Sequence, residues 1–279
     1  MSAVLPIVSR LTPRVVRVLG CNPGKMTLQG TNTYIIGTGK KRILLDTGEK
    51  GKKDYIKKLK EFLHQESVSI EQVIITHWHG DHIGGLEDVT SIIGDGSIAW
   101  KFPRSDIKNE SYDGITIHNL QDQQELSVEG ASLRIIYTPG HTADHVVVYM
   151  KEENALFSGD CILGEGTAVF EDLYDYMKSL SIILNLKPDI IYPGHGPVLE
   201  TPVEKIQYYI NHRNLRESQI KDVLTRKEEP LSEMDIVRII YKDTPESLYL
   251  AASNNVNQHL LKMEKEGIVH KKDSGWVLA

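Results

Sequence analysis

The sequence predicts an α/β protein in which two mixed β-sheets pack face to face, with helices on their outer sides and a helical module at the carboxyl end. Two features of the 279-residue chain support this fold class. Short β-branched runs alternate with amphipathic helical stretches twice over before about residue 200. After that point, long helical stretches replace the strands. We therefore expect a sheet domain over residues 1–202 and a separate module over residues 203–279.

The first half of the sheet domain is expected to begin with three strands and a helix. Apolar runs bounded by turn residues predict strands over residues 14–19, 31–37 and 41–45. The last two are joined by Gly37-Thr38-Gly39, so they form a hairpin that leads into Asp46. Apolar side chains then recur at helical spacing over residues 52–65. The opposite face of this helix is rich in lysine, which suits either a solvated surface or a contact track for phosphate groups.

The remaining elements of this domain follow from the same patterns. We expect short strands over residues 73–75, 97–102, 115–120, 126–128, 133–137, 146–150 and 155–158. Residues 173–186 are amphipathic at helical spacing and predict a second long helix. The apolar run Ile190-Ile191-Tyr192 then leads through Pro193 and Gly194 to His195.

The carboxyl-terminal module combines helices with a final hairpin. Helical patterns cover residues 203–224, 232–241 and 247–265, with a break at Glu228-Glu229-Pro230. A turn at Asp273-Ser274-Gly275 separates two short apolar runs, which predict the hairpin. This order resembles a winged helix-turn-helix, whose second helix enters a groove in nucleic-acid readers. Because residues 205–279 carry 12 basic and 11 acidic side chains, a packing lid or a dimer contact fits equally well.

Four side chains that bind metals fall within six residues, directly after the strand predicted at residues 73–75: His77, His79, Asp81 and His82. A strand that ends in histidines presents them on the loop beyond its carboxyl end, where they can converge on one point. Such clusters are scarce outside metal sites. The sequence therefore predicts a metal site. Imidazole and carboxylate ligands without a thiolate favour zinc, with manganese or iron as alternatives.

Composition limits the class of protein. Apolar residues make up 40% of the chain and charged residues 25%, as in soluble globular proteins. No apolar run approaches the ~20 residues that cross a bilayer, so we expect no membrane partner. Two cysteines are too few for a disulfide framework. The net charge is −6, yet residues 1–45 contain seven basic side chains and no acid, so an anionic substrate is not excluded.

The pattern His-x-His-x-Asp-His after a strand resembles the metallo-β-lactamase superfamily, and further matches follow in the expected order. They are Asp46 in Leu-Leu-Asp-Thr-Gly, His141 in Thr-Pro-Gly-His-Thr, Asp160 in Phe-Ser-Gly-Asp and His195 in Tyr-Pro-Gly-His-Gly. The resemblance covers about residues 15–200. It implies an αβ/βα sandwich of two mixed sheets that carries two metal ions.

Carried onto this chain, the family pattern implies two zinc ions per subunit. One would be held by His77, His79 and His141, and the other by Asp81, His82 and His195, with Asp160 bridging the two. Each ion would keep an open position for water. Two such ions lower the pKa of a shared water towards about 7, which implies hydrolysis by a zinc-activated hydroxide.

Three acidic or histidine side chains have expected roles around this pair of ions. Asp46 is expected to orient a ligand histidine or the backbone of the turn. Asp81, besides binding metal, is a candidate to orient the nucleophilic water. His145, four residues after His141, is a candidate proton donor to the leaving group or a contact for a substrate oxyanion. The alternative for His145 is a hydrogen bond that supports a ligand.

Among the branches of the superfamily, the sequence resembles the animal β-lactamase-like protein 2 branch. The resemblance rests on residues 157–166, residues 170–177 and the winged-helix-like tail. It implies an endoribonuclease of the mitochondrial matrix that cuts single-stranded RNA. The arginine-containing stretch before residue 18 loosely resembles a transit peptide, although Pro6 and Pro13 oppose a helix there.

Two other functions stay open. A glyoxalase-II-like thioesterase or another small-ester hydrolase would need the same metal pair. A non-catalytic scaffold would use the winged module to bind nucleic acid or protein, but the complete ligand set disfavours it. The sequence leaves the oligomeric state open, with a homodimer among the options.

Overall fold

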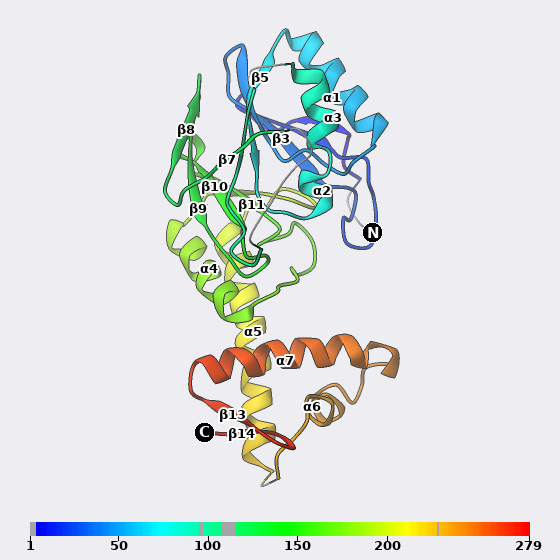
Figure 1. The fold of residues 1–279 in the computed structure, drawn as a ribbon, viewed down its shortest axis with the longest axis vertical. Helices are drawn as coiled ribbons and strands as arrows, with labels where there is room; N and C mark the ends of the chain where they lie inside the picture. The colour runs from blue at the N-terminus through cyan, green and yellow to red at the C-terminus, as the bar shows by residue number, and fades with distance from the viewer. Residues whose placement is uncertain (1–3, 95–96, 108–114, 228) are drawn as a thin grey trace.

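The computed structural model describes residues 4–94, 97–107, 115–227 and 229–279. Within them the chain forms a two-sheet sandwich and a smaller carboxyl-terminal module, joined by the long helix α5 (Figure 1). The strands of the sandwich are β1 (Val8–Arg10), β2 (Val15–Leu19), β3 (Asn32–Ile36), β4 (Lys41–Leu45), β5 (Ser69–Ile75), β6 (Ile98–Lys101), β7 (Ile117–Asn119), β8 (Glu125–Val128), β9 (Ala131–Tyr137), β10 (Val146–Met150), β11 (Ala155–Gly159) and β12 (Ile190–Pro193).

Seven helices accompany these strands among the described residues. They are α1 (Lys53–Glu66), α2 (Gly80–Ile83), α3 (Leu86–Ile93), α4 (Leu173–Leu186), α5 (Pro202–Thr225), α6 (Glu233–Ile240) and α7 (Tyr249–Lys265). Two short 3-10 turns, Lys151–Glu153 and Glu246–Leu248, follow β10 and precede α7. The final hairpin is β13 (Val269–Lys272) and β14 (Gly275–Leu278).

Both sheets of the sandwich are mixed. The first has the order β1-β2-β3-β4-β5-β6-β7, in which β1 to β4 are antiparallel neighbours and β4 to β7 are parallel. The second has the order β12-β11-β10-β9-β8, and its parallel pair is β11 with β12. The predicted α/β sandwich of two mixed sheets is therefore confirmed.

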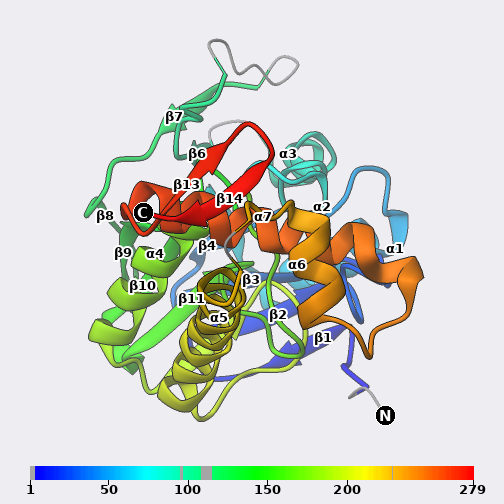
Figure 2. The same cartoon turned by 90° about the horizontal axis from the view of Figure 1, so that it is seen from below.

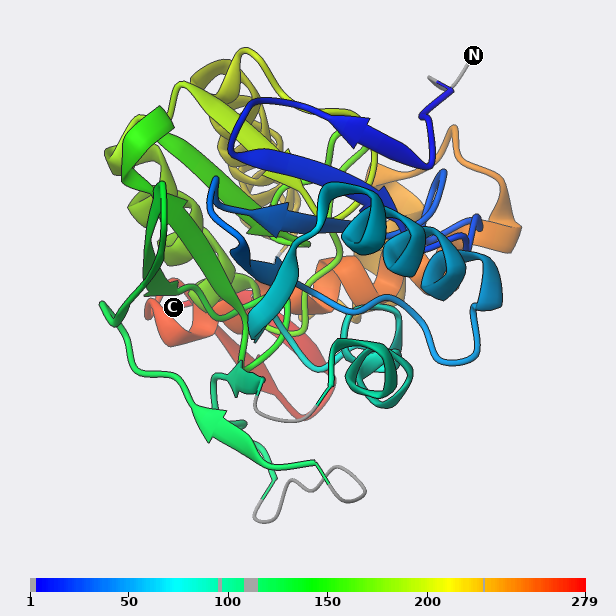
Figure 3. The same ribbon diagram turned by 90° about the horizontal axis from the view of Figure 1, so that it is seen from above.

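Apolar side chains fill three layers of the sandwich. Between the sheets lies one core, which includes Ile43, Leu133 and Phe157. A second core lies under α1 and α3, where Tyr55 and Val89 pack on the outer face of the first sheet. A third lies under α4 and α5 on the outer face of the second sheet. Figure 3 shows this order of helix, sheet, sheet and helix from above. Strands buried on both faces read as continuous apolar runs, which explains β10.

The carboxyl-terminal module has a core of its own around Trp276, Val256 and Ile236. Helix α6 begins at a capping box in which the Ser232 and Asp235 side chains bond each other's backbone N–H groups. Helix α7 packs on α6, on α4 and on the wing strand β13 (Figure 2). The predicted winged-helix arrangement, three helices followed by a hairpin, is confirmed. The predicted break between helices falls between α5 and α6, and its Glu228 lies outside the described residues.

The predicted strands and long helices all appear, mostly within one or two residues of the expected bounds, although β5 begins four residues earlier. Three short elements were missed: β1, α2 and α3. Strand β1 has three residues and pairs with β2, and α2 has four residues that begin inside the histidine motif. Such short segments carry too few apolar positions to establish a period. Among the described residues, no helix is both long and apolar enough to cross a bilayer.

Candidate metal centre

The predicted site residues lie where strands of both sheets end. Asp46 directly follows β4, and the histidine motif begins two residues after the end of the parallel neighbour β5. In the second sheet, Asp160 follows β11 and His195 comes two residues after the parallel neighbour β12. His141 lies in the turn between β9 and β10. Because the carboxyl ends of parallel strands meet at one edge of a sheet, the two sheets bring these loops together.

The first group of potential ligands is His77, His79, His141 and Asp160. His79 Nδ1 lies 3.0 Å from His77 Nε2 and 3.1 Å from His141 Nε2. Three ring nitrogens thus face one point. One carboxylate oxygen of Asp160 lies 3.8 Å from His141 Nε2.

The second group is Asp81, His82 and His195. Asp81 Oδ2 lies 3.3 Å from His82 Nε2 and 3.2 Å from His195 Nε2. Asp160 also reaches this group, because Oδ1 lies 3.3 Å from His82 Nε2 and Oδ2 lies 3.2 Å from His195 Nε2. The Asp160 carboxylate therefore lies between the two groups, which is the arrangement that the family pattern implied.

The outer nitrogens of three histidines are held by acceptors. His82 Nδ1 donates to Asp46 at 2.7 Å, and His141 Nδ1 donates to the Val169 carbonyl at 2.8 Å. Thr76 Oγ1 gives its own proton to Asp46, so it accepts from His77 Nδ1 at 2.9 Å. In its neutral form, each of these rings turns an unprotonated Nε2 towards the centre. Ligands oriented by such hydrogen bonds fit zinc or another ion that takes nitrogen and oxygen donors.

Two glycines make room for Asp160 and for His145, which holds the Asp160 backbone. A Cβ on residue 194 would lie 2.3 Å from Asp160 Oδ1, so only a glycine fits at this position. Gly159 has a positive φ of 48°, and a Cβ there would lie 2.7 Å from His145 Nε2. Among the described residues, no group makes a hydrogen bond to the buried Asp160 Oδ1, whose charged neighbour is His82 Nε2 at 3.3 Å. A buried carboxylate oxygen of this kind suits coordination to a cation.

Burial and the surrounding charges separate the histidines into two kinds. Burial, with the neighbouring imidazoles, holds the pKa of His77 well below its usual range and lowers the pKa of His79 to about 4. Burial also lowers the pKa of His195, but Asp160 and Asp81 outweigh it and raise the value to about 9. The carboxylates hold the pKa of His82 well above its usual range in the same way. The Asp160 side of the site therefore attracts positive charge, while the His77 side offers neutral lone pairs.

Asp46 supports both His82 and the turn after β5. Besides His82 Nδ1, its carboxylate accepts from Thr76 N at 2.8 Å and from Thr76 Oγ1 at 2.9 Å. The residue adopts a left-handed backbone conformation, with φ of 60°, which directs its side chain across to β5. This geometry performs both tasks expected of Asp46: it orients a ligand histidine and fixes the backbone.

His145 is fully buried, and both of its ring nitrogens have partners. Nε2 accepts from the backbone N–H of Asp160 at 3.2 Å, and Nδ1 lies 3.1 Å from Thr138 Oγ1. Burial holds the pKa of the ring well below its usual range. A neutral, enclosed imidazole is poorly placed to donate a proton to a leaving group. The structure therefore favours the alternative role, in which His145 positions Asp160.

Sequence reasoning missed several polar residues around the centre. Thr31 donates to Asp81 Oδ2 at 2.9 Å and is itself held by Asn22. Lys101 at the end of β6 pairs with Asp144 at 2.6 Å, and the two side chains are 2% and 0% exposed. Asp144 lies between His141 and His145, so this ion pair fixes their turn. A buried lysine or threonine has no signal in a single sequence, because its partner is distant along the chain.

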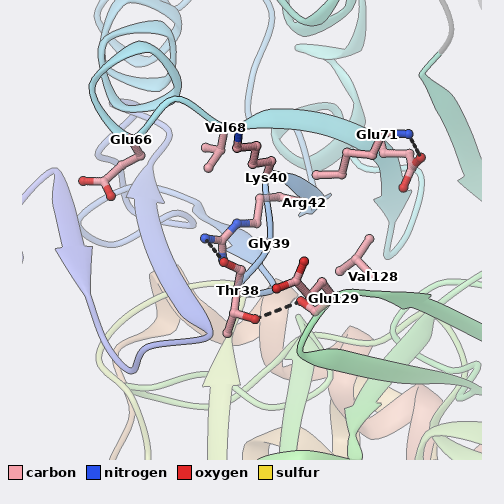
Figure 4. A pocket seen from close by; sticks show the side chains of 10 residues that line it. Thr38, Gly39, Lys40, Arg42, Glu66, Val68, Glu71, Val128 and Glu129 are labelled. Carbon is pink, nitrogen blue, oxygen red and sulfur yellow. Dashed lines mark hydrogen bonds and ion pairs between the residues drawn. The ribbon is translucent and has the colours of Figure 1, made fainter.

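A pocket at the opposite end of the parallel strands is separate from this centre. Its lining includes residues 38–42 and the start of β5, where Lys41 pairs with Glu71 at 2.6 Å (Figure 4). The histidine motif follows the carboxyl end of β5, and none of the predicted ligands lines this pocket. The metal centre is therefore the part of the described chain that gathers the predicted site residues.

Comparisons with known proteins agree with this fold. The metallo-beta-lactamase superfamily model matches residues 26–195, and the beta-lactamase associated winged helix domain matches residues 232–276. The chain belongs to the metallo-beta-lactamase superfamily. A beta-lactamase domain protein of Burkholderia ambifaria shares the fold with a TM-score of 0.81 at 16% identity, over 98% of this chain and 93% of that one.

Its relatives include two animal proteins of the branch that the sequence resembles. The beta-lactamase-like protein 2 homologue of Drosophila melanogaster is 53% identical over 95% of this chain and 92% of its own length. The homologue of Caenorhabditis elegans is 48% identical over 97% and 92%. The resemblance to this branch is thus confirmed. A fungal relative, the atrochrysone carboxyl ACP thioesterase of Passalora fulva, is 38% identical over 95% of this chain and 80% of its own.

Proposed function

We propose that this chain is a zinc-dependent endoribonuclease that hydrolyses phosphodiester bonds of single-stranded RNA. The hydrolytic part rests on one observation: two groups of histidine and carboxylate ligands face each other across Asp160. RNA as the substrate is what the resemblance to the animal β-lactamase-like protein 2 branch implies, and the likeness to its homologues extends over the winged module as well as the sandwich.

Bound in these two groups, a pair of zinc ions would lower the pKa of water towards about 7 and neutralise charge on a phosphoryl oxygen. The protein's own side chains hold the geometry for that chemistry. Thr31 fixes the direction of the Asp81 carboxylate, which stays 21% exposed and can accept a hydrogen bond that orients the attacking water. His145 and Gly159 set the position of the Asp160 backbone, and Asp46 sets the ring of His82.

The rim of the centre offers contacts for RNA. Trp78 lies between the ligands His77 and His79, and its ring centroid is 4.7 Å from that of His79. The Arg104 guanidinium stacks over Trp78 at 4.4 Å. An indole beside the metal ligands suits stacking of a nucleobase, while the Arg104 guanidinium is already paired with Asp106. Helix α1 begins seven residues after Asp46, so the lysines at its start are the candidate contacts for an RNA strand that leaves the centre on this side.

The substrate is tested by incubating labelled single-stranded RNA with the zinc-loaded protein. An Asp160→Asn variant and a chelated sample serve as controls. We expect internal cuts that vanish in both controls, because each removes the dinuclear arrangement. Uncut RNA with the loaded wild-type protein would refute the proposal. Full cutting by Asp160→Asn would refute the role of Asp160.

A thioesterase is the second candidate, and the fungal ACP thioesterase relative favours it. It is tested in the same protein with S-lactoylglutathione and an acyl-pantetheine thioester. An RNA contact should weaken steeply with salt, whereas an enclosed thioester site should be less sensitive. Thioester turnover without RNA cleavage would replace the nuclease with this candidate.

We also propose that the protein acts in the mitochondrial matrix, as the branch resemblance implies. Import of the tagged full-length chain into isolated mitochondria tests this. Protection from added protease, lost only when the inner membrane is opened, is expected. A chain that stays protease-sensitive outside the organelle would contradict it.

A further inference from the structure

Residues 163–172 form an irregular segment, which we call the bridging segment, that links the loops of two metal ligands. At its start, Gly164 N donates to the His195 carbonyl at 2.8 Å. Near its end, Glu171 N donates to the carbonyl of Gly140, next to His141, at 2.8 Å. In between, the Val169 carbonyl accepts from His141 Nδ1 at 2.8 Å. Because the bridging segment is neither helix nor strand, tertiary contacts have to fix its shape.

Helix α5 supplies those contacts from one face. Its residues Lys205, Tyr209 and Arg213 are four apart, so their side chains lie along one side of the helix. The Lys205 ammonium and the Tyr209 hydroxyl each donate to the Gly166 carbonyl at 3.2 Å, and the same hydroxyl accepts from Leu163 N at 3.2 Å. These three hydrogen bonds fix the first half of the bridging segment.

Arg213 holds the second half. Its Nη2 donates to the Ala168 carbonyl at 3.0 Å, and its guanidinium lies 4.7 Å from the ring centroid of Phe170. The peptide between these contacts carries the Val169 carbonyl that accepts from His141. Since the peptide units are planar, fixing Ala168 and Phe170 on either side limits how the Val169 carbonyl can turn.

We propose that Arg213 is a positioning residue for the metal centre. It orients the His141 ring through the Ala168-Val169 backbone and thereby holds the His77–His79–His141 group. Tyr209 assists it at Gly166. The inference goes beyond the proposed function because it holds for any substrate, although it uses the metal site of that proposal.

The carboxyl-terminal module braces this arrangement. On α7, Lys262 pairs with Glu217 of α5 at 2.6 Å, and Lys265 pairs with Asp172 at the end of the bridging segment. His259 of the same helix is fully buried beside Arg213. Burial, followed by Arg213 and Arg216, lowers the pKa of His259 to about 3, so it adds no positive charge at neutral pH. Helix α7 thus lies against α4 and α5 (Figure 1, Figure 2), and its ion pairs connect the module to the bridging segment.

The test compares Arg213→Gln with Arg216→Gln. Arg216 is three residues further along α5, but its guanidinium contacts Gln219 and Tyr241 rather than the bridging segment. Zinc affinity is measured by competition with a chromophoric chelator in the full-length proteins. A His141→Ala variant identifies which of the measured zinc affinities belongs to the first ligand group, which contains His141. Absorption spectra of the cobalt-substituted proteins report ligand geometry independently of catalysis.

We expect Arg213→Gln to lower the zinc affinity of the site identified by His141→Ala about tenfold and to shift the absorption bands of the cobalt-substituted protein. Arg213→Lys should recover part of this loss. Tyr209→Phe, which removes one hydroxyl, should give a smaller change in the same affinity and covers the case in which Arg213→Gln fails to fold. Arg216→Gln should leave both zinc affinities within twofold of wild type.

Two results would overturn the inference. The first is a folded Arg213→Gln protein, or a Tyr209→Phe protein if the former does not fold, with wild-type affinities and spectrum. The second is an equal loss in Arg216→Gln, which would indicate general packing. A wild-type chain that binds no zinc would sink the proposed metal chemistry as well, whereas missing RNA cleavage would leave this inference untouched.

Discussion

Replacing Asp46 by Asn should lower the stability of the fold and weaken zinc binding, because Asp46 connects His82 to the turn after β5. The buried carboxylate accepts three hydrogen bonds, from Thr76 N, Thr76 Oγ1 and His82 Nδ1, at 2.7–2.9 Å. An amide of the same shape has one oxygen to accept, and its NH2 group faces a donor in either orientation. At least one buried donor then loses its acceptor, which costs about 1–3 kcal/mol.

The free energy of unfolding of the metal-free protein, measured in urea, checks the first part of this effect. Because His82 also loses its fixed orientation or tautomer, zinc affinity should fall about 10–100-fold in a chelator competition. Asp189→Asn is the matched control, since Asp189 is exposed and makes no side-chain hydrogen bond among the described residues. If Asp46→Asn keeps wild-type stability and zinc affinity, the orienting role of Asp46 is wrong.

Three further predictions concern other parts of the molecule. Lys101→Met leaves the Asp144 carboxylate buried without its cation, so the free energy of unfolding measured in urea should fall by about 3–5 kcal/mol. A Lys101→Met/Asp144→Leu protein should regain part of this stability. An unchanged free energy of unfolding in the single variant would contradict the role of the buried pair. Trp78→Ala should weaken binding of single-stranded RNA by about 1–3 kcal/mol in a fluorescence titration, while thioester turnover stays the same. Equal losses of RNA affinity and thioester turnover would indicate damage to the neighbouring metal ligands. Charge reversal near the start of α1, at Lys52, Lys53 and Lys57, should lower the affinity for RNA and the slope of its salt dependence. Unaltered RNA binding would indicate that this face of the helix is only a solvated surface.

Local patterns in the sequence carried most of the architecture. Strand β10 is a continuous apolar run, β4 ends in one, and α4 repeats its apolar positions at helical spacing. These signals need only neighbouring residues. Helix α3 shows the limit, because its eight residues follow directly on the metal loop and contribute just Leu86 and Val89 to the buried core.

The candidate ligands could also be named from the sequence. Their residue types are uncommon, and each follows a strand at a recognisable junction, as His77 follows β5 and Asp160 follows β11. The role of His145 could not be decided in this way. Its spacing from His141 fits a proton donor and a supporting residue alike, and burial with both nitrogens bonded separates the two.

The sequence by itself determined the kinds of side chain available for chemistry and the order of the elements that carry them. The tertiary structure alone decided how those side chains are supported. Arg213 reaches Ala168 across 45 positions, and Asn32 holds the Pro193 carbonyl across 161. Local periodicity encodes contacts a few residues apart, whereas pairs this distant depend on how both sheets and α5 pack. A folded chain can place any two such residues together, so their contacts become visible only once the packing is known.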